Sequence, residues 1–204
     1  MTAYLREEGP TWVALTICYA AWAALTMGAP EAWWTYPLLV LVIAFQSSLT
    51  HEAVHGHPTP WPLLNEALLA APIGLSFPYR RYRDTHLAHH HDARLTDPYD
   101  DPESWYLDPS VWAGKPAWFR LMLRANNCAL GRMLIGPGLG FTRFVWSDIR
   151  MMLAGQREIQ RAWALHALGA VPVFWWLFEA GVSPLGYALA CYFGLSLINL
   201  RSFL

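Results

Sequence analysis

The chain has 204 residues, a length that corresponds to one domain of ordinary size. Hydrophobic residues make up 55% of the sequence and charged residues only 14%, which excludes a disordered chain. The formal net charge of -1 gives no electrostatic reason to expect DNA or RNA as a partner. The three cysteines form no closely spaced pair, so neither a disulfide framework nor a cysteine zinc site is indicated.

Four stretches without charged side chains organise the sequence. They predict membrane-spanning helices at about 11–28, 32–50, 162–178 and 184–200. Each contains about 17 to 19 residues, which at roughly 1.5 Å per residue approaches the roughly 30 Å of the hydrocarbon core. Buried helices of a soluble bundle are the alternative, but such helices usually keep a polar stripe, and these stretches have none. We therefore expect an all-α membrane protein with four transmembrane helices.

The four predicted spans form two hairpins. Residues 28–30 (Gly-Ala-Pro) separate the first pair and 181–184 (Gly-Val-Ser-Pro) the second, and both are typical turn sequences. Neither turn contains Lys or Arg, whereas most of the 14 basic residues lie between Arg80 and Arg161. The positive-inside rule therefore predicts that both termini and the segment 51–161 lie in the cytoplasm.

The segment between the hairpins is not uniform. An apolar stretch at 67–79 is too short to span and predicts a helix that lies in the membrane interface or dips into it. A mixed apolar and basic stretch at 131–146 predicts a second helix of this interfacial kind. Residues 92–108 are acidic and rich in proline, which favours a loop.

Seven of the eight histidines lie within 51–91, in two groups. The first group directly follows the second predicted span. His51 and His55 are four residues apart, so in a helix both imidazoles lie on one face and can reach one metal ion. His57 lies two residues further along.

The second group is close to His-x-x-His-His. His86, His89 and His90 have the spacing of one helix face, while His91 points elsewhere. Imidazole is the commonest metal ligand and suits iron, copper and zinc. The two groups together therefore predict a metal site. His166, alone in the third predicted span, is interpreted as a core residue.

The first group also matches the His-Glu-x-x-His signature of zinc proteases, in which Glu52 would be the general base. A mononuclear zinc site needs one more ligand and a water, not several extra histidines, and the later spans offer no acidic motif for that ligand. An intramembrane zinc protease is therefore an alternative of a different class. A non-catalytic membrane protein that binds metal is a third interpretation.

The order of these features resembles the membrane fatty acid desaturase superfamily. A helical hairpin is followed by His-x-x-x-His, an interfacial stretch, His-x-x-His-His, an Asp-Pro loop at 97–102 and a second hairpin. The resemblance covers most of the chain, which we treat as a single domain over 1–204. It implies an integral, multi-pass membrane enzyme with its histidines at the cytoplasmic face. The implied activity is diiron, O2-dependent oxidation of a lipid acyl chain, with desaturation as the expected reaction. A lipid or carotenoid hydroxylase or ketolase of the same superfamily is the alternative.

The resemblance also implies roles for individual residues. The matched metal ligands are five histidines: His51, His55, His86, His89 and His90. His57 and His91 are additional candidate ligands without a matching position in the family pattern. Asp97, Asp100 and Asp101 are expected to hydrogen-bond to ligands and orient them. No catalytic residue separate from the ligands is expected.

The expected cofactors and partners follow from the same resemblance. Two iron ions are the cofactor, O2 is the co-substrate, and a membrane lipid or acyl group is the substrate. Electrons would come from an external donor similar to a ferredoxin, a rubredoxin or cytochrome b5, and the sequence gives no oligomeric state. The resemblance implies a third histidine box beyond the fourth span, which this sequence does not contain. We therefore expect the sequence to be an incomplete portion of the enzyme, with a degenerate member that does not carry out the reaction as the alternative.

Overall fold

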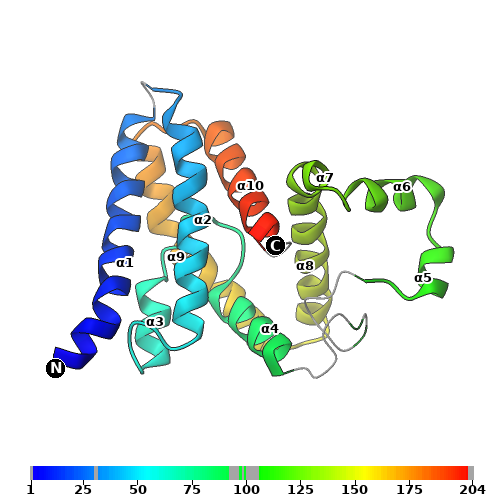
Figure 1. The fold of residues 1–204 in the computed structure, drawn as a ribbon, viewed down its shortest axis with the longest axis horizontal. Coiled ribbons are helices and arrows are strands. Elements are labelled where there is room, and N and C mark those ends of the chain that lie inside the picture. Colours follow the sequence, from blue (N-terminus) through cyan, green and yellow to red (C-terminus); the bar gives the residue numbers. More distant parts are fainter. Residues whose placement is uncertain (1, 30–31, 92–96, 98, 100–105, 202–204) are drawn as a thin grey trace.

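A computed structural model of the protein describes residues 2–29, 32–91, 97, 99 and 106–201 (Figure 1). This part of the chain is all-helical, without a strand among the described residues, which confirms the predicted all-α class. The helices are α1 (Thr2–Gly28), α2 (Thr35–Val54), α3 (Pro62–Leu68), α4 (Tyr79–His91), α5 (Pro109–Ala113), α6 (Ala117–Ala125), α7 (Ala129–Leu134), α8 (Gly136–Leu153), α9 (Arg157–Glu179) and α10 (Pro184–Arg201).

Helices α1, α2, α9 and α10 form a bundle, with α4 crossing one end of it (Figure 1). All four contribute to one apolar core, represented by Cys18, Leu39, Val173 and Ala190, which are at most 2% exposed. Two segments are long and apolar enough to cross a membrane, Glu7–Gly28 in α1 and the whole of α2. The apolar part of α10 is shorter.

Two tryptophans connect the helices of the bundle through polar contacts. The Trp22 indole N–H donates to the Tyr187 hydroxyl at 2.8 Å, which links α1 to α10. The Trp176 indole N–H donates to the Thr26 hydroxyl at 2.8 Å, which links α9 to α1. Because each indole finds an acceptor, Trp22 is buried and Trp176 partly buried without leaving an unsatisfied donor.

Residues 69–78 pass through the interior of the bundle without forming a helix. The helix predicted over 67–79 is therefore wrong, since α3 ends at Leu68 and α4 begins at Tyr79. Pro72 and Pro78 lack the backbone N–H that a helix needs, and Gly74 between them weakens a helix further. By contrast, the stretch 131–146 is largely helical, within α7 and α8.

The carbonyl groups of this interior segment accept hydrogen bonds from three surrounding helices. The Tyr19 hydroxyl of α1 lies 3.3 Å from the Ala71 oxygen, and the Gln46 amide of α2 donates to the same oxygen at 2.8 Å. The Tyr187 hydroxyl of α10 donates to the Ile73 oxygen at 2.6 Å. A buried carbonyl without a partner is costly, so these side chains are what allows the segment to lie among apolar helices.

Helix α9 approaches the same segment most closely at Gly169. A β-carbon at this position would overlap the carbonyl oxygen of Ala70. The absence of a side chain therefore lets α9 lie directly against the backbone of the interior segment.

We expect Gly169→Ala to lower the stability of the protein by about 1–3 kcal/mol, because the backbone of residue 70 would have to move. Gly9→Ala is the matched control, since Gly9 is also helical and no atom lies within 4 Å of its added β-carbon. Thermal unfolding in detergent is expected to show a lower Tm for Gly169→Ala alone. Equal Tm values for both variants would contradict the proposed contact.

Candidate metal centre

The first histidine pair lies at the carboxyl end of α2. His51 is in the last turn, and His55 is the residue at which the helix ends. The N–H of His57 donates to the Glu52 oxygen at 3.1 Å, and the N–H of Gly56 donates to the Ala53 oxygen at 3.2 Å. With Gly56 at a φ of 94°, this is a Schellman motif, which stops α2 immediately after His55.

The second histidine group lies on α4, which starts directly after Pro78. His86 is the buried member of the group, at 8% exposure. The ring of Tyr82 stacks on the ring of His86 with a centroid separation of 5.2 Å and an interplanar angle of 12°. This stacking fixes the orientation of the imidazole that lies between the two helices.

Helices α2 and α4 bring four imidazoles to one point. The Nε2 atom of His86 lies 3.3 Å from Nε2 of His55 and 3.0 Å from Nε2 of His90. One ring nitrogen from each of His51, His55, His86 and His90 lies within 4.8 Å of the other three. Nitrogen ligands about 2.1 Å from a common metal are roughly 3–4 Å apart, so small movements of the side chains would let the four residues hold a single ion.

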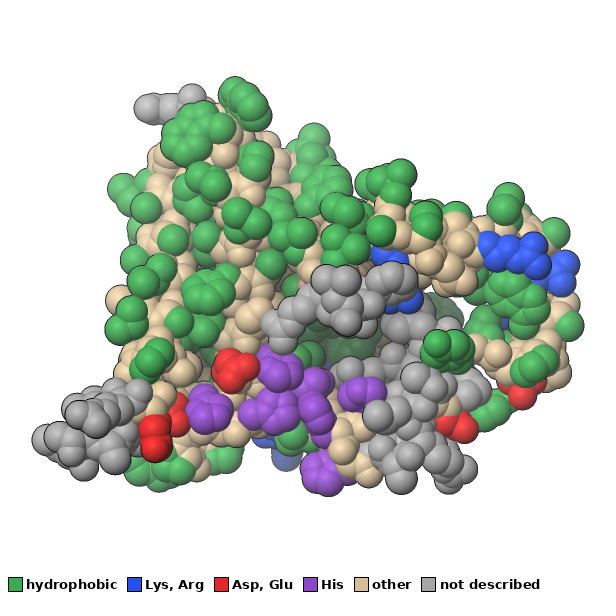
Figure 2. All heavy atoms as spheres, viewed as in Figure 1, with side chains coloured by type: hydrophobic (Ala, Val, Ile, Leu, Met, Phe, Trp, Pro, Cys, Tyr) green, Lys and Arg blue, Asp and Glu red, His purple; other side chains and the backbone are tan. Residues whose placement is uncertain are grey.

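The histidines gather at one end of the molecule, while hydrophobic side chains cover the sides of the bundle (Figure 2). Desolvation lowers the pKa of His55, and the neighbouring His51 and His90 lower it further. A lowered pKa favours the neutral imidazole, which is the form that binds a metal. His55 is therefore favoured in the form that can bind a metal cation.

A buried ion pair fixes α4 relative to the helices behind it. Arg81 of α4 donates from Nε and Nη2 to the carboxylate of Asp148 in α8, with separations of 2.8 to 3.1 Å. The indole N–H of Trp163 in α9 donates to the same carboxylate at 2.8 Å. Asp148 is 0% exposed, and breaking such a buried pair costs about 3–5 kcal/mol.

Sequence reasoning missed this triad of Arg81, Asp148 and Trp163. Asp148 is the only acidic residue between Pro109 and Arg157, in a stretch whose other charges are Lys and Arg. An isolated carboxylate in such a stretch is a signal of a buried partner, but it does not indicate which arginine is that partner.

The remaining predicted histidines lie outside the four-histidine group. The centroid of the His89 ring is 6.5 Å from that of His86, on the same helix. His91 points back along α4, with Nδ1 2.6 Å from the Leu87 carbonyl oxygen. His57 contacts Glu8 of α1. His166 packs edge-on against Trp163, with 5.8 Å between the ring centroids.

The predicted acidic residues are less informative. The carboxylate of Asp97 accepts a hydrogen bond from the N–H of Tyr99 at 2.8 Å, which is a local turn contact. Asp100 and Asp101 lie outside the described residues.

The comparisons with known proteins identify the family. The family model described as "Fatty acid desaturase" matches residues 31–204 of the chain. The chain belongs to the fatty acid desaturase family. Neither the search of curated proteins nor the search of solved structures found a match. Membership confirms the resemblance and implies an oxidoreductase, and the apolar helices α1 and α2 indicate association with a membrane.

The four-histidine group leads to a direct test by metal binding. We expect His86→Ala and His90→Ala to weaken Co(II) binding by about 100-fold or more, since each removes one ligand of a shared ion. His91→Ala is the matched control on the same helix and is expected to bind Co(II) like the wild-type protein. Co(II) titration followed by visible absorption measures this. Equal affinities of the His90 and His91 variants would contradict the grouping.

Proposed function

We propose that the protein is a membrane-bound diiron oxidoreductase that uses O2 to oxidise a lipid acyl chain, with desaturation as its reaction. The observation that supports this most strongly is the convergence of His51, His55, His86 and His90 at one end of an apolar helical bundle. Hydroxylation or ketolation of a lipid is the second candidate within the family, because the same ligands serve both kinds of reaction.

His51, His55, His86 and His90 would hold one iron ion, and His89 on the adjacent face of α4 is the best candidate ligand for a second. Bound iron would supply the reduction of O2, a reaction for which protein side chains have no suitable group. The contribution of the chain itself is positional. Tyr82 orients His86, and the Arg81–Asp148 pair keeps α4 at a fixed distance from α8 and α9.

We infer that α9 and α10 cross the membrane together with α1 and α2. The outward face of α9 carries exposed apolar side chains at helical spacing, including Leu168, Val171, Phe174 and Phe178. These side chains are 58% to 81% exposed, which suits contact with lipid rather than water. Pro172 is compatible with a span because neighbouring helices can satisfy the carbonyl that it leaves free. The charge pattern favours a cytoplasmic location of the histidines.

A cavity of about 340 Å³ lies between α2, the interior segment, α9 and α10, and its volume is typical of ligand sites. Its lining is mostly apolar. Thr50 and Tyr82 also line it. Thr50 precedes His51 and the Tyr82 ring stacks on His86, so the cavity lies close to the four-histidine group, although none of these four histidines lines it. On α2 the lining extends back to Ile43, eight residues before His51, which corresponds to about 12 Å along the helix.

We propose that this cavity holds the acyl chain of the substrate. An apolar cavity takes up a hydrocarbon chain because burial of its methylene groups is favourable by about 0.8 kcal/mol each. Arg80 and Glu66 also line it and form an ion pair at 2.7 Å, which offers a polar end for the head of an amphipathic substrate. The enclosed chain would be held away from water, with one segment fixed beside the histidines.

The reaction class is tested with the full-length protein. We expect the protein loaded with Fe(II) to form an oxidised lipid product when O2 and a reductant are supplied, and we expect Glu52→Gln to retain this activity. The product is measured by mass spectrometry of the extracted lipids. Activity with zinc alone, or peptide cleavage that Glu52→Gln abolishes, would instead identify the zinc protease.

The substrate cavity has its own test. We expect Ser47→Phe to lower the affinity for a long-chain fatty acid, because Ser47 lines the cavity on α2 and a phenyl ring would fill part of it. Co(II) affinity is expected to stay at the wild-type value, because Ser47 is outside the histidine group. Leu41→Phe is the control, since Leu41 is 57% exposed on the same helix and does not line the cavity. Unchanged fatty acid binding by Ser47→Phe would contradict this location.

A further inference from the structure

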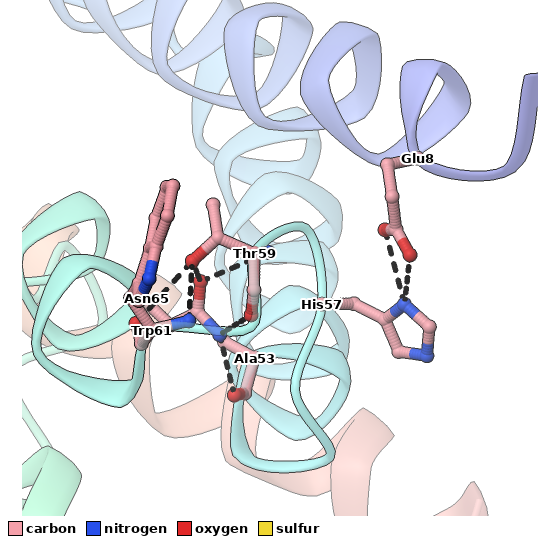
Figure 3. A network of polar contacts seen from close by, with 6 residues as sticks. All are labelled: Glu8, Ala53, His57, Thr59, Trp61 and Asn65. Atoms are coloured by element: carbon pink, nitrogen blue, oxygen red, sulfur yellow. Dashed lines mark hydrogen bonds and ion pairs between the residues drawn. The ribbon is translucent and has the colours of Figure 1, made fainter. Parts of the chain in front are cut away.

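A hydrogen-bonded contact connects the first helix to the turn that follows the first histidine pair. The Nδ1–H of His57 donates to both carboxylate oxygens of Glu8, at 2.8 and 3.0 Å (Figure 3). Glu8 belongs to α1 and its side chain is only 14% exposed. His57 lies two residues after His55, in the turn that leaves α2. The contact therefore joins segments that are 49 residues apart in the chain.

Because His57 closes the turn at the end of α2, its contact with Glu8 also affects the position of His55. His55 is the C-cap residue of α2, directly after Val54. Gly56 takes the left-handed conformation, and the N–H of His57 closes the Schellman motif on the Glu52 carbonyl oxygen. Any displacement of residue 57 thus opens the last turn of α2. That turn carries the imidazoles of both His51 and His55.

The turn is also held from the side of α3. The Asn65 amide donates to the carbonyl oxygens of Ala53 and Thr59, at 3.4 and 2.9 Å (Figure 3). The Asn65 carbonyl oxygen accepts a hydrogen bond from the Thr59 hydroxyl at 2.7 Å. Asn65 is 0% exposed, so these bonds are shielded from water. Asn65 and Glu8 therefore hold the turn between them, one from α3 and one from α1.

The amino-terminal part of α1 has one helical hydrogen bond fewer than an uninterrupted helix would have. Pro10 lies inside α1, where it removes one helical hydrogen bond between the turn of Glu8 and the apolar part of the helix. The contact with His57 is thus a means of fixing the start of α1 against the metal centre, beyond what the helix itself provides.

We propose that Glu8 and His57 form a positioning pair that fixes the last turn of α2 for metal binding, and that His57 is not itself a ligand. The inference rests on the proposed metal centre. It is supported by the absence of His57 from the group of four imidazoles and by the engagement of its Nδ1 with Glu8. A carboxylate can also orient a histidine that binds metal, so the test has to separate the two roles.

The test is a double-mutant cycle in the full-length protein, with Co(II) affinity and metal-free Tm as readouts. We expect Glu8→Ala and His57→Ala each to weaken Co(II) binding by about tenfold, the effect typical of residues that orient ligands. The double variant is expected to bind no more weakly than either single variant, because both substitutions remove the same contact. Glu7→Ala is the matched control, because Glu7 is an exposed carboxylate one residue away. This variant is expected to bind Co(II) with wild-type affinity.

His57→Asn distinguishes positioning from ligation. The asparagine amide nitrogen takes the place of Nδ1 and can still donate to Glu8, so we expect this variant to keep the wild-type Co(II) affinity. A loss of metal in both His57 variants with normal binding by Glu8→Ala would overturn the proposal and make His57 a ligand. A fall in Tm without any change in Co(II) affinity would overturn it in favour of a purely structural contact. Failure of the wild-type protein to bind Co(II) would contradict the proposed function as well, whereas normal wild-type binding with unchanged variants contradicts the positioning pair alone.

Discussion

The arrangement of the molecule depends on the hydrogen bonds that the backbone carbonyl groups of residues 69–78 accept inside an apolar bundle. Three side chains from three helices, Tyr19, Gln46 and Tyr187, donate to the carbonyl groups of Ala71 and Ile73 in this segment. Because an unpaired carbonyl among apolar helices costs several kcal/mol, a large part of a protein's total stability, these hydrogen bonds stabilise the observed path of the segment. Along this path the chain reaches the start of α4, and α4 lies beside the end of α2. It also forms one wall of the cavity, with α9 lying against it at Gly169.

The parts of the structure that depend on local spacing could be predicted from the sequence. The i, i+4 separations of His51 with His55 and of His86 with His90 place each pair on one helix face, whatever surrounds them. The length and apolar character of α1 and α2 predict candidate spans for the same reason. Contacts between distant segments could not be predicted. Arg81 meets Asp148 across 67 residues, and no local pattern selects Arg81 as the partner among the arginines of the chain.

The helix wrongly predicted over 67–79 shows how tertiary contacts can replace local structure. Apolar composition alone favoured a helix, but Pro72 and Pro78 prevent its hydrogen bonding, and partners from other helices compensate. His57 gives a second example. Its position in the sequence made it a candidate ligand, whereas its contact with Glu8 depends on α1, which no spacing rule brings to that point. In both cases the deciding partner is far away in the chain.

The central claim is that imidazoles from α2 and α4 share one metal ion. X-ray absorption spectroscopy of the iron-loaded full-length protein tests it most directly, because imidazole ligands give characteristic multiple scattering beyond the first coordination shell. We predict a first shell of nitrogen and oxygen only, with an imidazole contribution that decreases when His90 is replaced by alanine. A shell that contains sulfur, or an imidazole contribution unchanged by that replacement, would contradict the account.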